Sequence, residues 1–402
     1  MVSPTYRSFT YRSLPTAGWM LILLLVASHL AALRAEEPAA KAEEQEASRI
    51  EALVAQLGSD DFTQREAASD ELTRAGVRAF AALEAAAAHP DREVRYRSIR
   101  VLGQIREIDL KRRLEAFLGG TDDDAEYPLP GWDRFRKAYG DESASRKLFV
   151  EMTRADAELL RSLAESPRAA AEALASQATA QQQAMQLGAG QMSLGQVAVM
   201  LFIAAEADVT LPAPTLNLVF NFCHQAALRE SLASGDKNSV PRKMVGSLIR
   251  RSESWATYTA LNLAIVYGLD EGMVPAVKVL EGGDQQAAHI TQYALITVAR
   301  FGDRSHLPLV EKLLADTKVF TRMQENKSIY EVQIRDAALA AAIILSKQDL
   351  KTYFVGRPDQ QWTDPQQVFF NPRLIGFEND EQRTAAHKKW TEFKEKQAED
   401  VP

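Results

Sequence analysis

The length, composition and charge of this chain narrow the class of protein. Its 402 residues are 46% hydrophobic and 25% charged, which is typical of globular proteins. The net charge of −7 argues against bulk nucleic-acid binding, because phosphate contacts need clustered lysine and arginine. Cys223 is the single cysteine, so no intrachain disulfide can form and packing alone must hold the fold.

The first 35 residues have the pattern of a secretory signal. They carry three arginines and no acid, and an apolar stretch, "AGWMLILLLVASHLAALRA", runs over 17–35. We expect cleavage after Ala35, which would change the net charge from −7 to −10 and place the protein in the periplasm or outside the cell. The alternative is an uncleaved helix over 17–33 that tethers the protein to a membrane, although a span needs about 20 apolar residues.

A short pattern then recurs along the body of the chain. "DFTQREAASDELTRAG" (61–76) and "DREVRYRSIRVLGQI" (91–105) align with an offset of 30 residues. Further copies begin near 253, 287 and 331. One column of the alignment holds only small residues, which are Ala68, Ser98, Ala260, Ala294 and Ala338. A small side chain at a fixed point of a helix lets a second helix approach closely, and apolar residues four and seven positions later share its face.

Each copy is preceded by a second helical segment, so the predicted unit is a pair of helices joined by a short turn. The units recur every 30–34 residues, and the last interval is longer because of a segment, 318–330, that we expect to be an inserted loop. Gly76, Gly268 and Gly302 end the preceding helices and suit left-handed caps. A fixed period in this range predicts an all-α fold, an α-solenoid of stacked antiparallel helix pairs.

The repeated segments resemble those of a known family. "DREVRYRSIRVL" at 91–102 fits D-x-x-V-R-x-x-S-x-x-V-L and, with "LITVARFGDRSHLPLVEKLLAD" at 295–316, is similar to HEAT repeats of the short bacterial, phycobilisome-lyase-like variety. The resemblance covers about 48–107 and 253–347. It implies an exported bacterial HEAT-repeat protein that serves as a binding scaffold.

In that family the acid and the arginine of the motif tie neighbouring repeats together. The resemblance therefore implies this role for two pairs here, Asp61 with Arg65 and Asp91 with Arg95. Thr257 and Thr291 replace the arginine, so we expect this ladder to be interrupted in the second block of repeats.

These observations divide the chain into six predicted parts. They are a signal peptide or membrane anchor (1–35), a linker (36–47), N-terminal HEAT-like repeats (48–120), a helical middle region with a long loop (121–250), C-terminal HEAT-like repeats (251–347), and an irregular tail with a final helix (348–402). Proline and glycine predict irregular loops at about 121–142 and 351–378. We expect Trp132 and Phe135 to pin the first loop.

Residues for catalysis or metal binding do not fall into a recognisable pattern. The six histidines lack metal-ligand spacing, and neither a Gly-x-Ser-x-Gly elbow nor a phosphate-binding glycine loop occurs. Cys223 shares a helical face with Val219 and Phe220, which favours a core position over a nucleophile. The acidic run at 122–126 lacks the glycine and glutamate of a calcium loop. We therefore expect a non-enzymatic protein with no metal and no cofactor.

Two groups of residues are candidates for partner binding. Arg92, Tyr96 and Arg100 form an i, i+4 stripe, and a tyrosine between two arginines suits a protein interface. The second group is a basic cluster, Arg242, Lys243, Arg250 and Arg251. For both groups the alternative is an ordinary solvated helix face.

The predicted function is that of an exported scaffold that binds another protein and no nucleic acid. Two alternatives stay open. One is a membrane-anchored assembly or accessory factor, and the other is an enzyme of the lyase type after which these short repeats are named.

Overall fold

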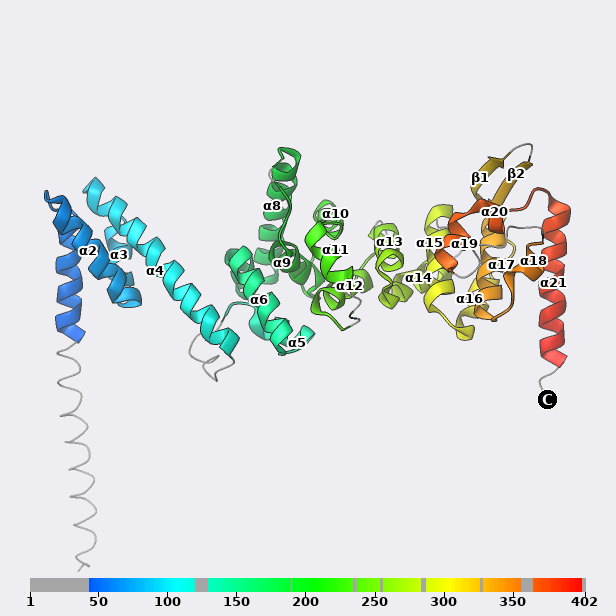
Figure 1. The fold of residues 1–402 in the computed structure, drawn as a ribbon, viewed down its shortest axis with the longest axis horizontal. Helices are drawn as coiled ribbons and strands as arrows, with labels where there is room; N and C mark the ends of the chain where they lie inside the picture. The colour runs from blue at the N-terminus through cyan, green and yellow to red at the C-terminus, as the bar shows by residue number, and fades with distance from the viewer. Residues whose placement is uncertain are drawn as a thin grey trace, which may run out of the picture. The chain divides into compact units, whose positions relative to one another are not determined.

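The computed structural model describes residues 43–119, 129–188, 190–233, 236, 238–253, 256–282, 287–325, 328–355 and 364–399 (Figure 1). These residues are mostly helical, and the sheet found among them has two strands, which confirms the all-α class. The chain divides into two compact units, Met1–Gly119 and Gly120–Pro402. The predicted signal at 1–35, the tether at 17–33, residues 36–42 of the linker and the acidic run at 122–126 lie outside the described residues.

The first unit is built from helices that surround a small apolar core. Its elements are a helix over 43–56, α2 (Phe62–Ala75), the 3-10 helix η1 (Gly76–Ala79), α3 (Phe80–Ala86) and the long α4 (Arg92–Gly119). Helices α2 and α3 both pack against α4. Leu57, Leu72 and Leu83 are fully buried between them, because apolar residues recur at helical spacing on the inward faces.

The two aligned acids perform the same task 30 residues apart. Asp61 Oδ1 accepts a hydrogen bond from the Thr63 N–H at 2.8 Å, and Asp91 Oδ1 accepts one from the Glu93 N–H, also at 2.8 Å. Each acid thereby satisfies a free N–H group at the start of a helix and faces the positive end of its dipole. Hydrogen bonds from the N–H groups of Val94, at 3.1 Å, and Glu93 lower the pKa of Asp91.

The two aligned arginines also repeat one geometry. Arg65 Nη1 donates to the Ser59 carbonyl at 2.6 Å, and Arg95 Nη1 donates to the His89 carbonyl at 2.8 Å. Each guanidinium therefore holds the turn that leads into its own helix. The resemblance instead implied that these arginines connect neighbouring repeats. Arg65 also makes one such connection, because its Nε lies 3.3 Å from Glu93 of α4.

The stronger tie between α2 and α4 comes from a residue that the motif did not single out. Arg97 of α4 is nearly buried and lies 2.7 Å from Glu66 of α2 and 2.7 Å from Glu93 of its own helix. These contacts lower the pKa of Glu66. The buried guanidinium is thus paired on both sides, which a buried charge requires.

The second unit contains the remaining elements. In chain order they are α5 (Trp132–Tyr139), α6 (Ser143–Ala155), α7 (Ala157–Glu165), α8 (Pro167–Gln186), α9 (Leu194–Ala205), α10 (Ala213–Phe222), α11 (Ala226–Ala233), α12 (Val240–Arg250), α13 (Thr257–Tyr267), η4 (Asp270–Gly272), α14 (Met273–Glu281), α15 (Ala288–Phe301), η6 (Arg304–His306), α16 (Leu307–Glu311), β1 (Val319–Glu325), β2 (Ser328–Gln333), α17 (Ile334–Leu345), α18 (Leu350–Tyr353), α19 (Pro365–Phe370), α20 (Pro372–Ile375) and α21 (Asp380–Glu399). Helices mostly contact near neighbours in the chain, such as α14 with α15 and α15 with α17.

The column of small residues is buried at all five positions, as predicted. Their exposed fractions are 1% for Ala68 and 0% for Ser98, Ala260, Ala294 and Ala338. Ala260, Ala294 and Ala338 lie on α13, α15 and α17, and α15 packs against both of the other helices. A small side chain at the crossing therefore permits close helix packing along this row.

The predicted loop at 318–330 is instead part of an antiparallel hairpin. Strands β1 and β2 pair from Val319 with Gln333 to Glu325 with Ser328. The segment is rich in β-branched and aromatic residues, which favour strands, and Val332 is fully buried. The helical periodicity of the flanking segments concealed this local preference.

The structure differs from both predicted irregular loops. In the first, at 121–142, residues 132–139 form helix α5, and Trp132 and Phe135 are buried against Phe149 of α6. In the second, at 351–378, the short helices α19 and α20 and most of α18 occur. Proline cannot continue a helix, and its frequency in this segment led to the prediction of a loop. Proline also occupies the first position of α19 and of α20, where its missing N–H costs little.

One of the three predicted glycine caps has the expected left-handed backbone, Gly268 with φ of 64° and ψ of 47°. Gly76 also has φ of 64°, which favours glycine, but its ψ of −140° lies outside the left-handed helical region. Gly302 has φ of −78° and ψ of 177°, so its backbone is extended and the predicted left-handed cap is wrong. A Cβ there would lie 2.5 Å from the Val298 carbonyl oxygen, so close approach explains this glycine.

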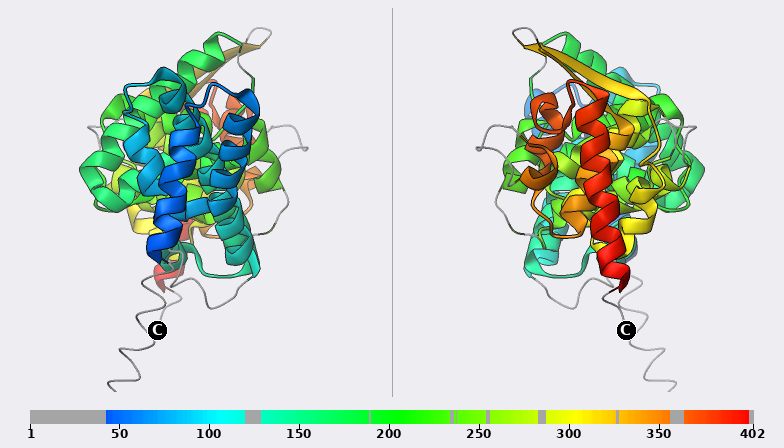
Figure 2. Two further views of the ribbon diagram at one scale, coloured as in Figure 1. Left: turned by 90° about the vertical axis from the view of Figure 1, so that its left-hand side faces the viewer. Right: turned by 90° about the vertical axis from the view of Figure 1, so that its right-hand side faces the viewer.

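A buried ion pair fixes the last helix to the rest of the second unit. Helix α21 contacts α17 and α18 and is red in the right-hand view of Figure 2. Arg383 Nε of α21 lies 2.9 Å from Asp336 Oδ1 of α17, and the two side chains are 5% and 0% exposed. Asp336 Oδ2 also accepts from the Gln333 N–H at 2.9 Å, and the Arg383 guanidinium lies over the Phe377 ring.

Candidate functional site

The exposed face of α4 carries the first predicted group. Arg92, Tyr96 and Arg100 are all exposed, and Tyr96 has 63% of its surface accessible. Ile99 lies between them in sequence and is 55% exposed, although the sequence analysis did not single it out. We call these four residues the α4 stripe. The opposite face of the helix is held in the core of the first unit by residues such as Leu102.

Arg242 belongs to the second predicted group, but its guanidinium serves the fold. Its Nη1 donates to the Tyr267 carbonyl at 2.9 Å, and its Nη2 donates to the Gly268 carbonyl. Arg300 of α15 donates to the Ile265 carbonyl at 2.6 Å. The carbonyl end of α13 is therefore capped by two arginines, which suits the negative end of a helix dipole.

Arg251 has the same kind of role at the end of α9. Its guanidinium donates to the carbonyls of Ala204 at 2.8 Å and Val209 at 3.0 Å, and also to that of Glu206. Burial lowers the pKa of Arg251, although Glu206 lies near enough to oppose the change. The basic cluster is thus not a single surface, because Arg242 and Arg251 bond to different helix ends.

Arg250 and Lys243 remain exposed on α12. Arg250 Nη1 lies 3.4 Å from Glu271, a weak and partly solvated pair. Lys243 lies on the exposed side of the same helix. Of the predicted basic cluster, these two residues are therefore the ones that face solvent.

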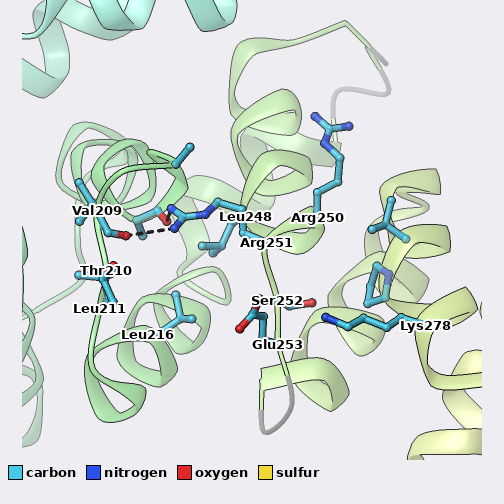
Figure 3. Close-up of a pocket in the computed structure, with 14 residues that line it drawn as sticks. Val209, Thr210, Leu211, Leu216, Leu248, Arg250, Arg251, Ser252, Glu253 and Lys278 are labelled. Carbon is cyan, nitrogen blue, oxygen red and sulfur yellow. Dashed lines mark hydrogen bonds between the residues drawn. The ribbon is translucent and has the colours of Figure 1, made fainter. Parts of the chain in front are cut away.

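Arg250 and Arg251 line a cleft of about 500 Å³ in the second unit (Figure 3). A volume of this order suits a small ligand. The apolar lining includes Leu211, which precedes α10, Leu216 of α10 and Val274 of α14. The polar lining comes from the segment before α10, the end of α12 with the segment after it, and α14, and it consists of Thr210, Arg250, Arg251, Ser252, Glu253 and Lys278.

An exposed group of aromatic residues lies elsewhere in the second unit. Tyr258 of α13 and Tyr293 of α15 have ring centroids 4.8 Å apart, and His289 and Phe370 pack at their edges. Burial raises the pKa of Tyr293. Sequence reasoning missed this group because its members come from three helices that are distant in the chain.

Cys223 is a core residue, as predicted. It is fully buried, its Sγ donates to the Val219 carbonyl, and burial raises the pKa of the thiol to about 12. The thiolate is the reactive form, so it accumulates only as the pH approaches that raised value.

We therefore expect no reaction of Cys223 with an aromatic disulfide reagent at about pH 8 while the protein is folded. In denaturant one thiol per chain should react, since the sequence holds one cysteine. The measurement is the absorbance of the released thiolate. Stoichiometric modification of the folded protein would contradict a buried thiol.

Neither a metal centre nor a membrane-spanning helix is found in the part of the chain that the structure describes. No group of three or more His, Cys, Asp and Glu residues there could hold a metal ion. None of the described helices has the length and apolar character needed to cross a bilayer.

Comparisons with protein-family models, with curated proteins and with solved structures found no match to this chain.

Proposed function

We propose that this protein is a non-enzymatic, exported scaffold of stacked HEAT-like helix pairs that binds another protein. The repeated local geometry supports the repeat assignment. Asp61 and Asp91 cap their helices in the same way, and Arg65 and Arg95 each bond to the carbonyl six residues earlier. The burial of the five small residues supports an extension of the repeat into the second unit.

The observation that carries the binding function is the α4 stripe. It exposes the ring of Tyr96 and the aliphatic side chain of Ile99 on a helix whose other face is buried. Exposed large apolar groups flanked by arginine are typical of protein interfaces, where tyrosine and arginine supply much of the binding energy.

Export is proposed from the composition of residues 1–35. Fractionation of the native host, followed by mass spectrometry of the mature N-terminus, distinguishes the two forms. A first residue at Glu36 indicates a cleaved signal, and an intact leader in the membrane fraction indicates an anchored accessory factor. Full recovery from the cytoplasm would contradict both.

The double substitution Tyr96→Ala/Arg100→Ala tests the binding surface. Both side chains are exposed, so each change should shift the free energy of unfolding by less than about 0.5 kcal/mol. Loss of two interface anchors should reduce partner recovery from the native envelope by at least about tenfold, since each anchor contributes about 1–2 kcal/mol. Quantitative mass spectrometry of the captured proteins measures the effect.

A matched control uses exposed residues of the same unit that lie outside α4. Arg74→Ala/Val77→Ala removes one arginine and one apolar side chain from α2 and η1. This variant should recover the same partners as the unmodified chain. Equal recovery by both double variants would show that the α4 stripe is only a solvated face.

A further inference from the structure

The cleft in the second unit has an uneven distribution of charge. Its lining holds three cations, Arg250, Arg251 and Lys278, and one acid, Glu253. Two of the cations are already engaged, because Arg251 donates to three carbonyls and Arg250 lies near Glu271. The ammonium group of Lys278 makes no hydrogen bond or ion pair with the residues that the structure describes, so one positive charge is available to a ligand.

Lys278 and Ser252 lie on the same side of the cleft. In Figure 3 Lys278 extends from α14 toward Ser252 and Glu253, whereas Arg250 points away from them. Ser252 is 5% exposed, and its buried Oγ has no hydrogen-bond partner among the residues that the structure describes. A buried hydroxyl without a hydrogen-bond partner is unfavourable, and a ligand oxygen that accepts from it would supply that partner.

The other side of the cleft is aliphatic. Leu211 and Leu216, on this side, are half-buried. Val274 lies one turn before Lys278 on α14 and is 52% exposed, so apolar surface remains accessible to a ligand on both sides. A ligand that fits both sides combines an aliphatic portion with an anionic end. A single free ammonium group favours a monoanion, and Glu253 opposes a second negative charge in the same space.

We propose that this cleft binds an aliphatic carboxylate, with the carboxylate at Lys278 and Ser252 and the alkyl portion against Leu211, Leu216 and Val274. A hydrogen bond from a lysine ammonium group to a carboxylate is charge-assisted, and such bonds are stronger than those between neutral groups. The same chemistry is offered by a free medium-chain fatty acid and by the C-terminal end of a peptide with apolar last residues. The site lies in the second unit and is independent of the proposed role of α4.

Isothermal titration of the full chain with octanoate, and with octanamide as its uncharged match, tests the charge requirement. Octanoate should bind with one site per chain, and octanamide should bind at least about tenfold more weakly. N-acetyl-leucyl-leucine and its C-terminal amide form a second pair. Tighter binding of the peptide acid than of octanoate would identify a peptide C-terminus as the source, and the reverse order would identify a fatty acid.

Lys278→Met keeps the length of the side chain and removes its charge. It should weaken binding of the tighter acid by about tenfold or more, because one charge-assisted contact is lost. Lys243→Met removes an exposed lysine of α12 that does not line the cleft, and it should bind as the unmodified chain does. Ser252→Ala should weaken binding several-fold.

The proposal is overturned if neither acid binds, if each amide binds as tightly as its acid, or if Lys278→Met leaves the affinity unchanged. None of these results bears on partner capture through α4. Conversely, a failure of Tyr96→Ala/Arg100→Ala to affect partner recovery leaves the titrations unaffected.

Discussion

Replacing Asp336 with alanine is expected to lower the free energy of unfolding by about 3–5 kcal/mol. The change leaves the Arg383 guanidinium, 5% exposed, without the buried carboxylate that lies 2.9 Å from it, and Asp380, which is 78% exposed, is its remaining carboxylate partner. It also removes the acceptor for the Gln333 N–H at the start of α17. Urea denaturation followed by circular dichroism measures the loss.

Two further variants separate the buried charge from other effects. Arg322→Ala breaks an ion pair with Glu331 in which the arginine is 65% exposed, and it should cost less than about 1 kcal/mol. Asp336→Leu/Arg383→Met removes both charges together and should recover much of the loss, because no unpaired ion stays buried. If Asp336→Ala costs no more than Arg322→Ala, the pair does not hold α21 in place.

Gly195→Ala should destabilise the second unit by about 1–3 kcal/mol, although alanine is the better helix former. Gly195 is buried in α9 where it crosses α6. A Cβ there would lie 2.4 Å from the Glu151 carbonyl oxygen and 2.7 Å from its carbon, so the two helices would have to separate. Thermal denaturation monitored by circular dichroism measures the effect.

The same substitution at Gly103 is the control. Gly103 lies on the exposed side of α4, and a Cβ there would meet nothing within 4 Å. Gly103→Ala should therefore stabilise the protein by about 0.5–1 kcal/mol through helix propensity alone. Opposite signs for the two changes indicate that close packing, and not propensity, requires Gly195. A neutral or stabilising Gly195→Ala would contradict the α6–α9 crossing.

Periodic features of the sequence predicted the helices and their buried faces well. The spacing alone placed Ala260, Ala294 and Ala338 on equivalent helix faces, and all three are fully buried. Helical phase also predicted which residues of α4 are exposed. Burial and exposure along a helix depend on residues a few positions apart, so the periodic pattern of the sequence indicates them directly.

Contacts between segments that are far apart in the chain produce no periodic pattern in the sequence. Asp336 and Arg383 are separated by 47 residues, and neither motif nor spacing links them. The engagement of Arg251 by carbonyls at the end of α9 depends on how α9 packs with α12. The sequence showed a basic cluster there, but it could not show which of its charges the fold itself would use.

The same reason explains the part of the cleft that sequence analysis missed. Lys278 lies on α14 and Ser252 in the segment after α12, and they match no motif, so only the packed structure brings them to one cavity. The hairpin at β1 and β2 was missed for a different reason, since the repeat period suggested an insertion without defining its local structure.

Site-specific photo-crosslinking from position 96 in living cells of the native host tests the central claim most directly. A benzophenone amino acid replaces Tyr96, and a second strain carries it at Val77, which is 44% exposed but lies on η1. Illumination should give a discrete crosslinked protein from position 96 that is absent or much weaker from position 77. Equal crosslinking from both positions, or none from position 96, would contradict partner binding through the α4 stripe.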